Sequence, residues 1–150
     1  MTSDPFVSFA PNREDVVLHR AFKDVRPGNF LDIGVRGPVE LAISHAFARL
    51  GWAGQQILAG EPTDGIEVPD QDLHFVVVDG TPAERIALLG QVLPDAVRPW
   101  VLVLRDSRDG ATAQADGVAV EPFAARGYDL CLNDGVSLFL VDQDRAGTMR

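Results

Sequence analysis

Apolar residues in this chain occur in two patterns: short unbroken runs, and longer stretches in which they are spaced three or four residues apart. Unbroken runs rich in β-branched and aromatic residues are typical of strands buried on both faces of a sheet. They predict strands at residues 29–33, 73–79 and 100–104, and a further strand is expected at residues 55–59. Apolar residues that alternate with polar ones predict two more strands at residues 128–132 and 136–141. The spaced stretches predict helices at residues 14–24, 38–50, 81–93 and 118–126. Alternating strands and helices are typical of an α/β domain.

The last two predicted strands flank Asn133-Asp134-Gly135, a sequence that favours a β-hairpin. The earlier strands are separated by helices, and such crossovers connect parallel strands. We therefore expect a single domain over residues 1–150 with a three-layer, Rossmann-like α/β fold. Its sheet should be mostly parallel and end in a C-terminal antiparallel hairpin. Residues 1–11 and 143–150 are expected to be flexible ends.

Composition excludes several classes of function. A net charge of −9 and a pI near 4.6 argue against a basic face for nucleic acid. No apolar run approaches the roughly 20 residues of a membrane span, and the first residues lack a signal-peptide pattern, so we expect a cytoplasmic protein without membrane contact. Cys131 is the only cysteine, and no Cys/His spacing indicates a metal site.

The segment Gly28–Pro38 (GNFLDIGVRGP) is the clearest candidate for a ligand site. A buried strand that runs into a glycine-containing turn and then a helix is the nucleotide-binding opening of many α/β domains. Ligands of such sheets lie outside the carboxyl ends of the strands, here after Ile33, Ala59, Val78 and Leu104. A tight turn between any strand and helix would also use these glycines, so a purely structural interpretation stays open.

Several motifs resemble FkbM-type methyltransferases. Residues 8–18 (SFAPNREDVVL) are similar to that family's S-x-A-Q-N-x-E-D-V-x-L, and residues 28–54 to its G-F-Y-x-D-V-G-A-N-D-P … A-F-Y-x-R-G-W-x-G. His74-Phe75 and Asp79 resemble H-F-L-K-I-D-V-E-G, and Arg98–Val103 and Ala125–Tyr128 resemble the family's last helix and strands. The resemblance implies an O-methyltransferase that uses S-adenosylmethionine and acts on the hydroxyl of a sugar or other small molecule, in secondary metabolism or a glycan pathway.

The resemblance also implies roles for individual residues. Asp32, Gly34, Arg36 and Glu61 would surround the cofactor, and Asp79 would be the catalytic residue near the reacting centre. Each acid has a structural alternative: Asp32 could fix the glycine turn, Glu61 could be a solvated loop acid, and Asp79 could cap the following helix.

The chain departs from the family in four places. Arg36 replaces an asparagine and brings a cation towards a cofactor that is itself cationic. Glu61 reaches its family position only through a two-residue insertion, and residues 77–82 lack the lysine and glutamate of K-I-D-V-E-G. A single loop, residues 61–72, stands where the family has a further helix and strand, so one or more internal βα units are missing.

These departures describe a shortened, degenerate member and leave a second interpretation open. In that interpretation the protein is non-catalytic and serves as a binding or scaffold partner, or takes a different, anionic ligand at Arg36. The missing unit would also expose the second strand as a sheet edge. We therefore expect a homodimer, or a partner protein, at that edge.

Overall fold

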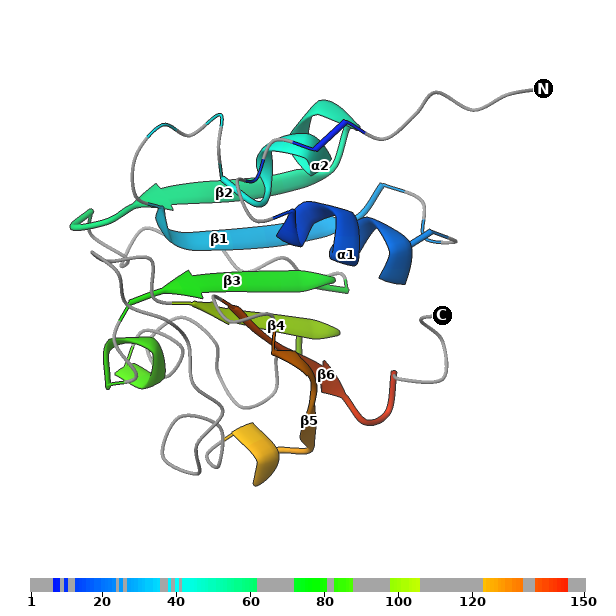
Figure 1. The fold of residues 1–150 in the computed structure, drawn as a ribbon, viewed down its shortest axis with the longest axis vertical. Helices are drawn as coiled ribbons and strands as arrows, with labels where there is room; N and C mark the ends of the chain where they lie inside the picture. The colour runs from blue at the N-terminus through cyan, green and yellow to red at the C-terminus, as the bar shows by residue number, and fades with distance from the viewer. Residues whose placement is uncertain are drawn as a thin grey trace.

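The computed structural model describes residues 7–8, 10, 13–23, 25, 27–35, 38, 40, 42–61, 72–80, 83–87, 98–105, 123–133 and 137–145. Its main elements, in chain order, are α1 (Glu14–Ala21), β1 (Asn29–Val35), α2 (His45–Arg49), β2 (Ala53–Leu58), β3 (Phe75–Asp79), β4 (Val101–Arg105), β5 (Tyr128–Asn133) and β6 (Ser137–Asp142) (Figure 1). Residues 83–87 and 123–124 are also helical. No helix within these ranges is long and apolar enough to cross a membrane.

The strands form one six-stranded sheet with the order β2-β1-β3-β4-β6-β5. Strands β1 to β4 are parallel, whereas β6 is antiparallel to both of its neighbours, β4 and β5. This arrangement confirms the predicted mixed sheet with its C-terminal antiparallel hairpin, and the fold is Rossmann-like α/β. The chain goes from β1 to β2 on one side and then returns to β3 on the other, so the strand order reverses next to β1. Such a reversal is the usual ligand position in open α/β sheets.

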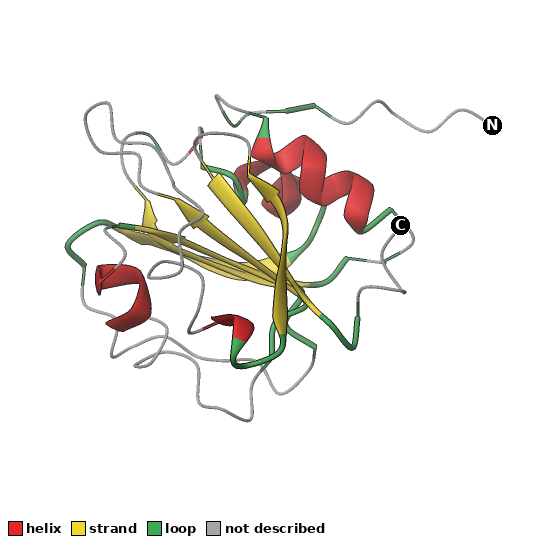
Figure 2. Ribbon diagram, turned by 60° about the horizontal axis from the view of Figure 1, so that its bottom comes forward, coloured by secondary structure: helices red, strands yellow, loops and turns green. Residues whose placement is uncertain are grey.

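Side chains alternate between two cores, one on each face of the sheet. One core joins Phe30, Phe75 and Val103 to apolar residues of α1 and α2, and the other contains Leu31, Val76 and Leu104. Figure 2 shows helices on both sides of the sheet, as a three-layer fold requires.

One prediction near the start of the chain was wrong in detail. Among the described residues of the helix predicted over 38–50, the α-helix covers His45–Arg49; Ala42–Ser44 form a bend and turns, and Ser44 is hydrogen-bonded to Asp32 on β1. The arm expected to be loose is anchored at Ser8 and Ala10, which donate hydrogen bonds to the Asp15 carboxylate at 2.6 and 3.1 Å.

The segment between β2 and β3 was expected to lack a βα unit of the family. The described parts of this segment, residues 59–61 and 72–74, contain no strand, and residues 62–71 lie outside the described ranges. Within the described sheet, β2 is an edge strand, as the sequence predicted.

Candidate functional site

The carboxyl ends of the parallel strands carry a row of polar residues on the face covered by α1. Asp32 lies two residues beyond Phe30 on β1, and Asp79 and Arg105 end β3 and β4 directly opposite each other. The Asp32 and Asp79 side chains are buried, although each follows an apolar run. Strand alternation therefore brings two of the predicted site residues to one end of the sheet, next to the reversal in strand order.

The Asp32 carboxylate holds the segment that leads into α2. Its Oδ2 accepts hydrogen bonds from the backbone N–H of Ser44 at 3.2 Å and from the Ser44 hydroxyl at 2.6 Å. Gln56 on β2 donates in turn to the Ser44 hydroxyl oxygen at 3.0 Å. Burial raises the pKa of Asp32 to about 6; the Ser44 hydrogen bonds and the charge of Arg105 oppose this rise only in part. This carboxyl therefore titrates close to neutral pH.

Gly34 allows the end of β1 to approach β3. It has φ of 81°, and a Cβ at this position would overlap the carbonyl oxygen of Asp79. The strand pairing with β2 is also irregular between Ile33 and Val35. Only glycine meets both requirements without strain, so Gly34 brings the backbone of β1 against Asp79.

Asp79 belongs to a buried ionic cluster that sequence reasoning did not predict. Arg105 Nε lies 3.5 Å from Asp79 Oδ2, and Arg105 Nη1 lies 3.4 Å from Glu14 Oε2 at the start of α1. The same Glu14 oxygen accepts a hydrogen bond from the hydroxyl of Ser137 on β6 at 2.9 Å. Glu14 is fully buried, and its Oε1 has no hydrogen-bond partner among the described residues. The cluster thus fixes the N-terminus of α1 over the carboxyl ends of β3, β4 and the first residue of β6.

One signal in the sequence could have indicated Arg105. It directly follows the buried run Trp100–Leu104, the same position relative to its strand that singled out Asp79. For Glu14 the sequence showed only its place in residues 8–18, the segment that resembles the family, because nothing local shows that α1 reaches β4 and β6.

Glu61 follows β2, at the same end of the sheet. Its backbone N–H donates to the carbonyl of Leu58 at 3.0 Å, and its Oε1 accepts from the Leu58 N–H at 2.7 Å. The Ala59 N–H donates to the Val35 carbonyl at 2.8 Å, which keeps this turn beside the end of β1. The Glu61 side chain is solvent-exposed. Arg36, the fifth predicted site residue, lies outside the described residues.

The charge of this end of the sheet is negative. The described carboxylates at this end (Glu14, Asp32, Glu61, Asp79 and Glu84) outnumber its described cations, Arg105 and the buried Arg85 of the helix after β3. Carboxylates accept hydrogen bonds from hydroxyl and amine groups and attract positive charge, whereas they repel phosphate. No group of three potential metal ligands occurs within the described ranges.

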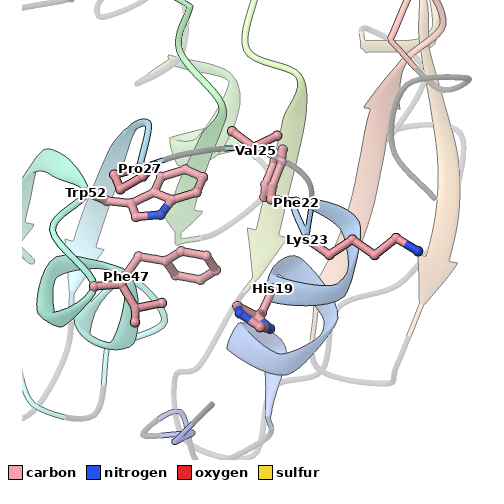
Figure 3. A pocket seen from close by; sticks show the side chains of 8 residues that line it. His19, Phe22, Lys23, Val25, Pro27, Phe47 and Trp52 are labelled. Carbon is pink, nitrogen blue, oxygen red and sulfur yellow. The ribbon is translucent and has the colours of Figure 1, made fainter. Parts of the chain in front are cut away.

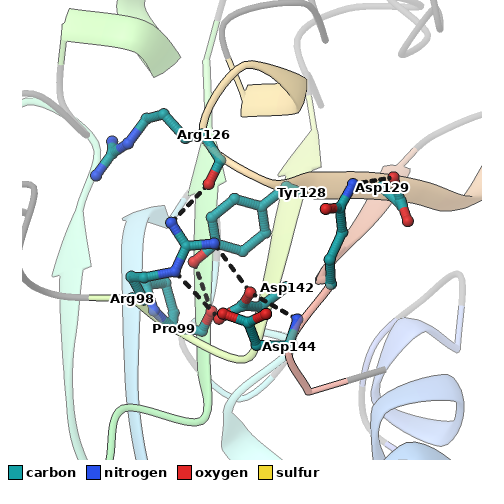
Figure 4. Close-up of polar contacts among 8 residues, drawn as sticks. Arg98, Pro99, Arg126, Tyr128, Asp129, Asp142 and Asp144 are labelled. Carbon is teal, nitrogen blue, oxygen red and sulfur yellow. Dashed lines mark hydrogen bonds and ion pairs between the residues drawn. The ribbon is translucent and has the colours of Figure 1, made fainter. Parts of the chain in front are cut away.

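The opposite end of the sheet is held together by contacts that explain its polar residues structurally. Arg98 donates to the Arg126 carbonyl at 2.6 Å, pairs with Asp142 at 2.9 Å, and lies over the Tyr128 ring (Figure 4). The Tyr128 hydroxyl donates to the Pro99 carbonyl at 2.6 Å. Together these contacts join the residues before β4 to the β5–β6 hairpin.

His74 at this end has a structural role as well. Its Nδ1 accepts a hydrogen bond from the Asn29 N–H at 3.2 Å, and its ring packs on Trp52 and Trp100. Burial lowers the pKa of His74 and so favours the neutral ring that this hydrogen bond requires.

No protein-family model matches the chain, and no curated protein matches it either. Among solved structures, it is similar to a protein of the NADB-Rossmann superfamily from Streptococcus agalactiae. The sequence identity is 12% and the TM-score 0.47, and the alignment covers 90% of this chain and 68% of the other. The fold assignment above rests on the strand order and pairing of this chain.

Proposed function

We propose that the chain binds S-adenosylmethionine at the carboxyl ends of β1, β2 and β3, in the manner of a methyltransferase. One observation carries this proposal: beside the reversal in strand order each of these three strands contributes a carboxylate, with Asp32 inside β1, Glu61 after β2 and Asp79 at the end of β3. The ligand has a ribose with two hydroxyls, an ammonium, a carboxylate and a sulfonium, and no phosphate, so its net charge is positive. Its charge is therefore complementary to this end of the sheet, whereas that of a dinucleotide is not.

The residues present fit such a ligand in different ways. Glu61 uses Oε1 for Leu58, while its Oε2 has no hydrogen bond to a described residue and is placed to accept from ribose hydroxyls. Asp32 would act mainly through its charge, since Ser44 already occupies one of its oxygens. Gly34 has no side chain, so it would let a ligand lie directly against the backbone at the end of β1. Arg36 opposes binding by charge, which is why its replacement belongs in the test.

S-adenosylmethionine, when bound, supplies an electrophilic methyl group. For catalysis, Asp79 would accept the proton of an acceptor hydroxyl, and Arg105 would orient the Asp79 carboxylate. Methyl transfer depends mainly on holding donor and acceptor in line, so the positioning of these two side chains matters more than their basicity. The acceptor class suggested by the resemblance is a small-molecule or sugar hydroxyl.

A second candidate function is non-catalytic: a methyltransferase-like protein that binds a ligand or a partner. The observation that favours it is that Asp32, Asp79 and Glu61 each already contact this chain's own groups. In this alternative the three acids stabilise the fold through their contacts with Ser44, Arg105 and Leu58.

Calorimetric titration separates the two candidates. The natural protein and a Glu61→Gln variant are titrated with S-adenosylmethionine, S-adenosylhomocysteine and NAD⁺. We expect micromolar binding of the first two ligands, no binding of NAD⁺, and an affinity at least fivefold weaker for Glu61→Gln. Asp129→Asn is the matched control, because it removes one exposed carboxylate on β5 whose contact to Gln143 an asparagine can keep. An Arg36→Asn variant completes the series. If neither that variant nor the natural protein binds, the non-catalytic alternative is favoured.

A further inference from the structure

A pocket of about 220 Å³ lies at the amino ends of β1 and β2, at the opposite end of the sheet from the carboxylates (Figure 3). We call it the amino-end pocket. It is lined by His19, Phe22, Lys23, Val25, Pro27, Phe47, Leu50 and Trp52. These residues come from the end of α1, the connection to β1, the end of α2 and the residue before β2, so the pocket lies between the two helices.

Three aromatic side chains form a firm inner wall. The Phe47 and Trp52 rings pack edge to face with centroids 5.0 Å apart, and Phe22 lies 5.6 Å from Trp52. All three side chains are buried and belong to the core beneath α1 and α2, which fixes their orientation. In Figure 3 they surround one hollow, and His19 faces them from α1. A wall of this kind favours a flat apolar group.

Among the described residues, the rim of the pocket carries positive and no negative charge. No acidic residue in the described ranges lines it, whereas Lys23, the only lysine of the chain, does. Lys23 is exposed and makes no ion pair with any residue in the described ranges; in Figure 3 its stem and ammonium extend outwards, away from the aromatic side chains. His19 adds a second group that can carry positive charge. In a protein of net charge −9, this combination is complementary to an anion.

We propose that the amino-end pocket binds a small aromatic carboxylate, with its ring against Trp52 and Phe47 and its carboxylate paired to Lys23. The volume limits the ligand to about a single ring, since pockets for drug-sized molecules span roughly 300–1,000 Å³. Leu50, about half exposed at the edge, would cover one side of the ring. This inference does not depend on the proposed function, because the pocket shares no residue with the carboxyl ends of the strands.

Phenylacetate is the probe, and benzyl alcohol is its neutral counterpart. Both are titrated into the natural protein while the indole N–H resonance of Trp52 is followed by NMR. For a ligand of this size we expect a phenylacetate dissociation constant on the order of 1 mM, and benzyl alcohol binding about fivefold weaker. A Lys23→Gln variant should lose about fivefold in affinity for phenylacetate and keep that for benzyl alcohol.

Arg20→Gln is the matched control, since it removes the same charge from an exposed position of α1 that does not line the pocket. It should bind phenylacetate as the natural protein does. The proposal is overturned if phenylacetate leaves the Trp52 resonance unmoved at 10-fold its expected dissociation constant. It is equally overturned if both ligands bind alike, or if Arg20→Gln weakens binding as much as Lys23→Gln.

Discussion

Replacing Asp32 by asparagine should make the protein relatively more stable as the pH rises. The Asp32 carboxyl is almost fully buried, and burial raises its pKa from an ordinary 3.8 to about 6. Asparagine has the same shape, stays neutral, and can accept both Ser44 hydrogen bonds through its amide oxygen. The variant therefore imitates the protonated form of Asp32 at every pH.

The magnitude follows from the two pKa values. The folded protein holds the proton more tightly than the unfolded chain, so stability from this group is fully present below pH 3.8 and is lost as the pH rises through about 6. The difference corresponds to about 3 kcal/mol over the whole range. Roughly 1 kcal/mol of it is lost between pH 5 and pH 7.5, a range that avoids acid unfolding.

Urea unfolding followed by tryptophan fluorescence measures this effect, since Trp52 and Trp100 are both buried. The free energy of unfolding of Asp32→Asn, relative to the natural protein, should rise by about 1 kcal/mol from pH 5 to pH 7.5. Asp129→Asn, on the exposed β5, should show no such trend. If the free energy of unfolding of Asp32→Asn, relative to the natural protein, stays constant or falls as the pH rises, the reasoning is refuted. Asp32 would then not be a buried carboxylate that is destabilised by its charge.

Three further predictions concern the same end of the sheet and its edge. Gly34→Ala should lower the free energy of unfolding by at least about 2 kcal/mol, and by clearly more than Gly60→Ala does. Gly60 is the control because it shares the positive φ but has open space where a Cβ would lie. If thermal unfolding shows equal losses of stability in the two variants, the contact with Asp79 is disproved. Ser137→Ala should lower the free energy of unfolding by about 1–3 kcal/mol, because buried Glu14 loses a hydrogen-bond donor. If Ser137→Ala lowers it no more than the exposed Ala53→Ser substitution does, this prediction is contradicted. The β2 edge should pair with a second copy of the chain, so light scattering at micromolar concentration should give a dimer mass. Gln56→Pro removes a backbone N–H that faces away from β1, because Ala53 and Ala59 donate towards β1, and it should give a monomer; a natural protein that is already monomeric would refute the proposal.

The sequence predicted the central strands well because each of them is a local apolar run. β3 and β4, buried along their length, are the clearest cases, and Asn133-Asp134-Gly135 placed the final hairpin correctly. The length of α2 could not be predicted in the same way. Its start depends on the hydrogen bonds between Ser44 and Asp32, which join separate elements and leave no trace in helical spacing.

The candidate site was predictable in its position but not in its contacts. Gly34, Asp79 and Glu61 lie at or after the carboxyl ends of strands, and Asp32 lies inside β1 beside them. The partners of these residues depend on tertiary packing: the register of β3 and β4 places Arg105 opposite Asp79, and Arg105 reaches Glu14 only because α1 crosses the sheet to β4 and β6. The family resemblance likewise gave Glu61 a ligand role without indicating that its carboxylate turns back to Leu58.

Calorimetric titration of the natural protein with S-adenosylmethionine and NAD⁺ tests the central claim most directly. Because carboxylates dominate the carboxyl ends of β1, β2 and β3, we predict micromolar binding of S-adenosylmethionine that strengthens as the pH rises through about 6, where Asp32 becomes charged. NAD⁺, with its two phosphates, should give no heat of binding at the same concentrations. Binding of NAD⁺ without S-adenosylmethionine, or the absence of both, would contradict the account.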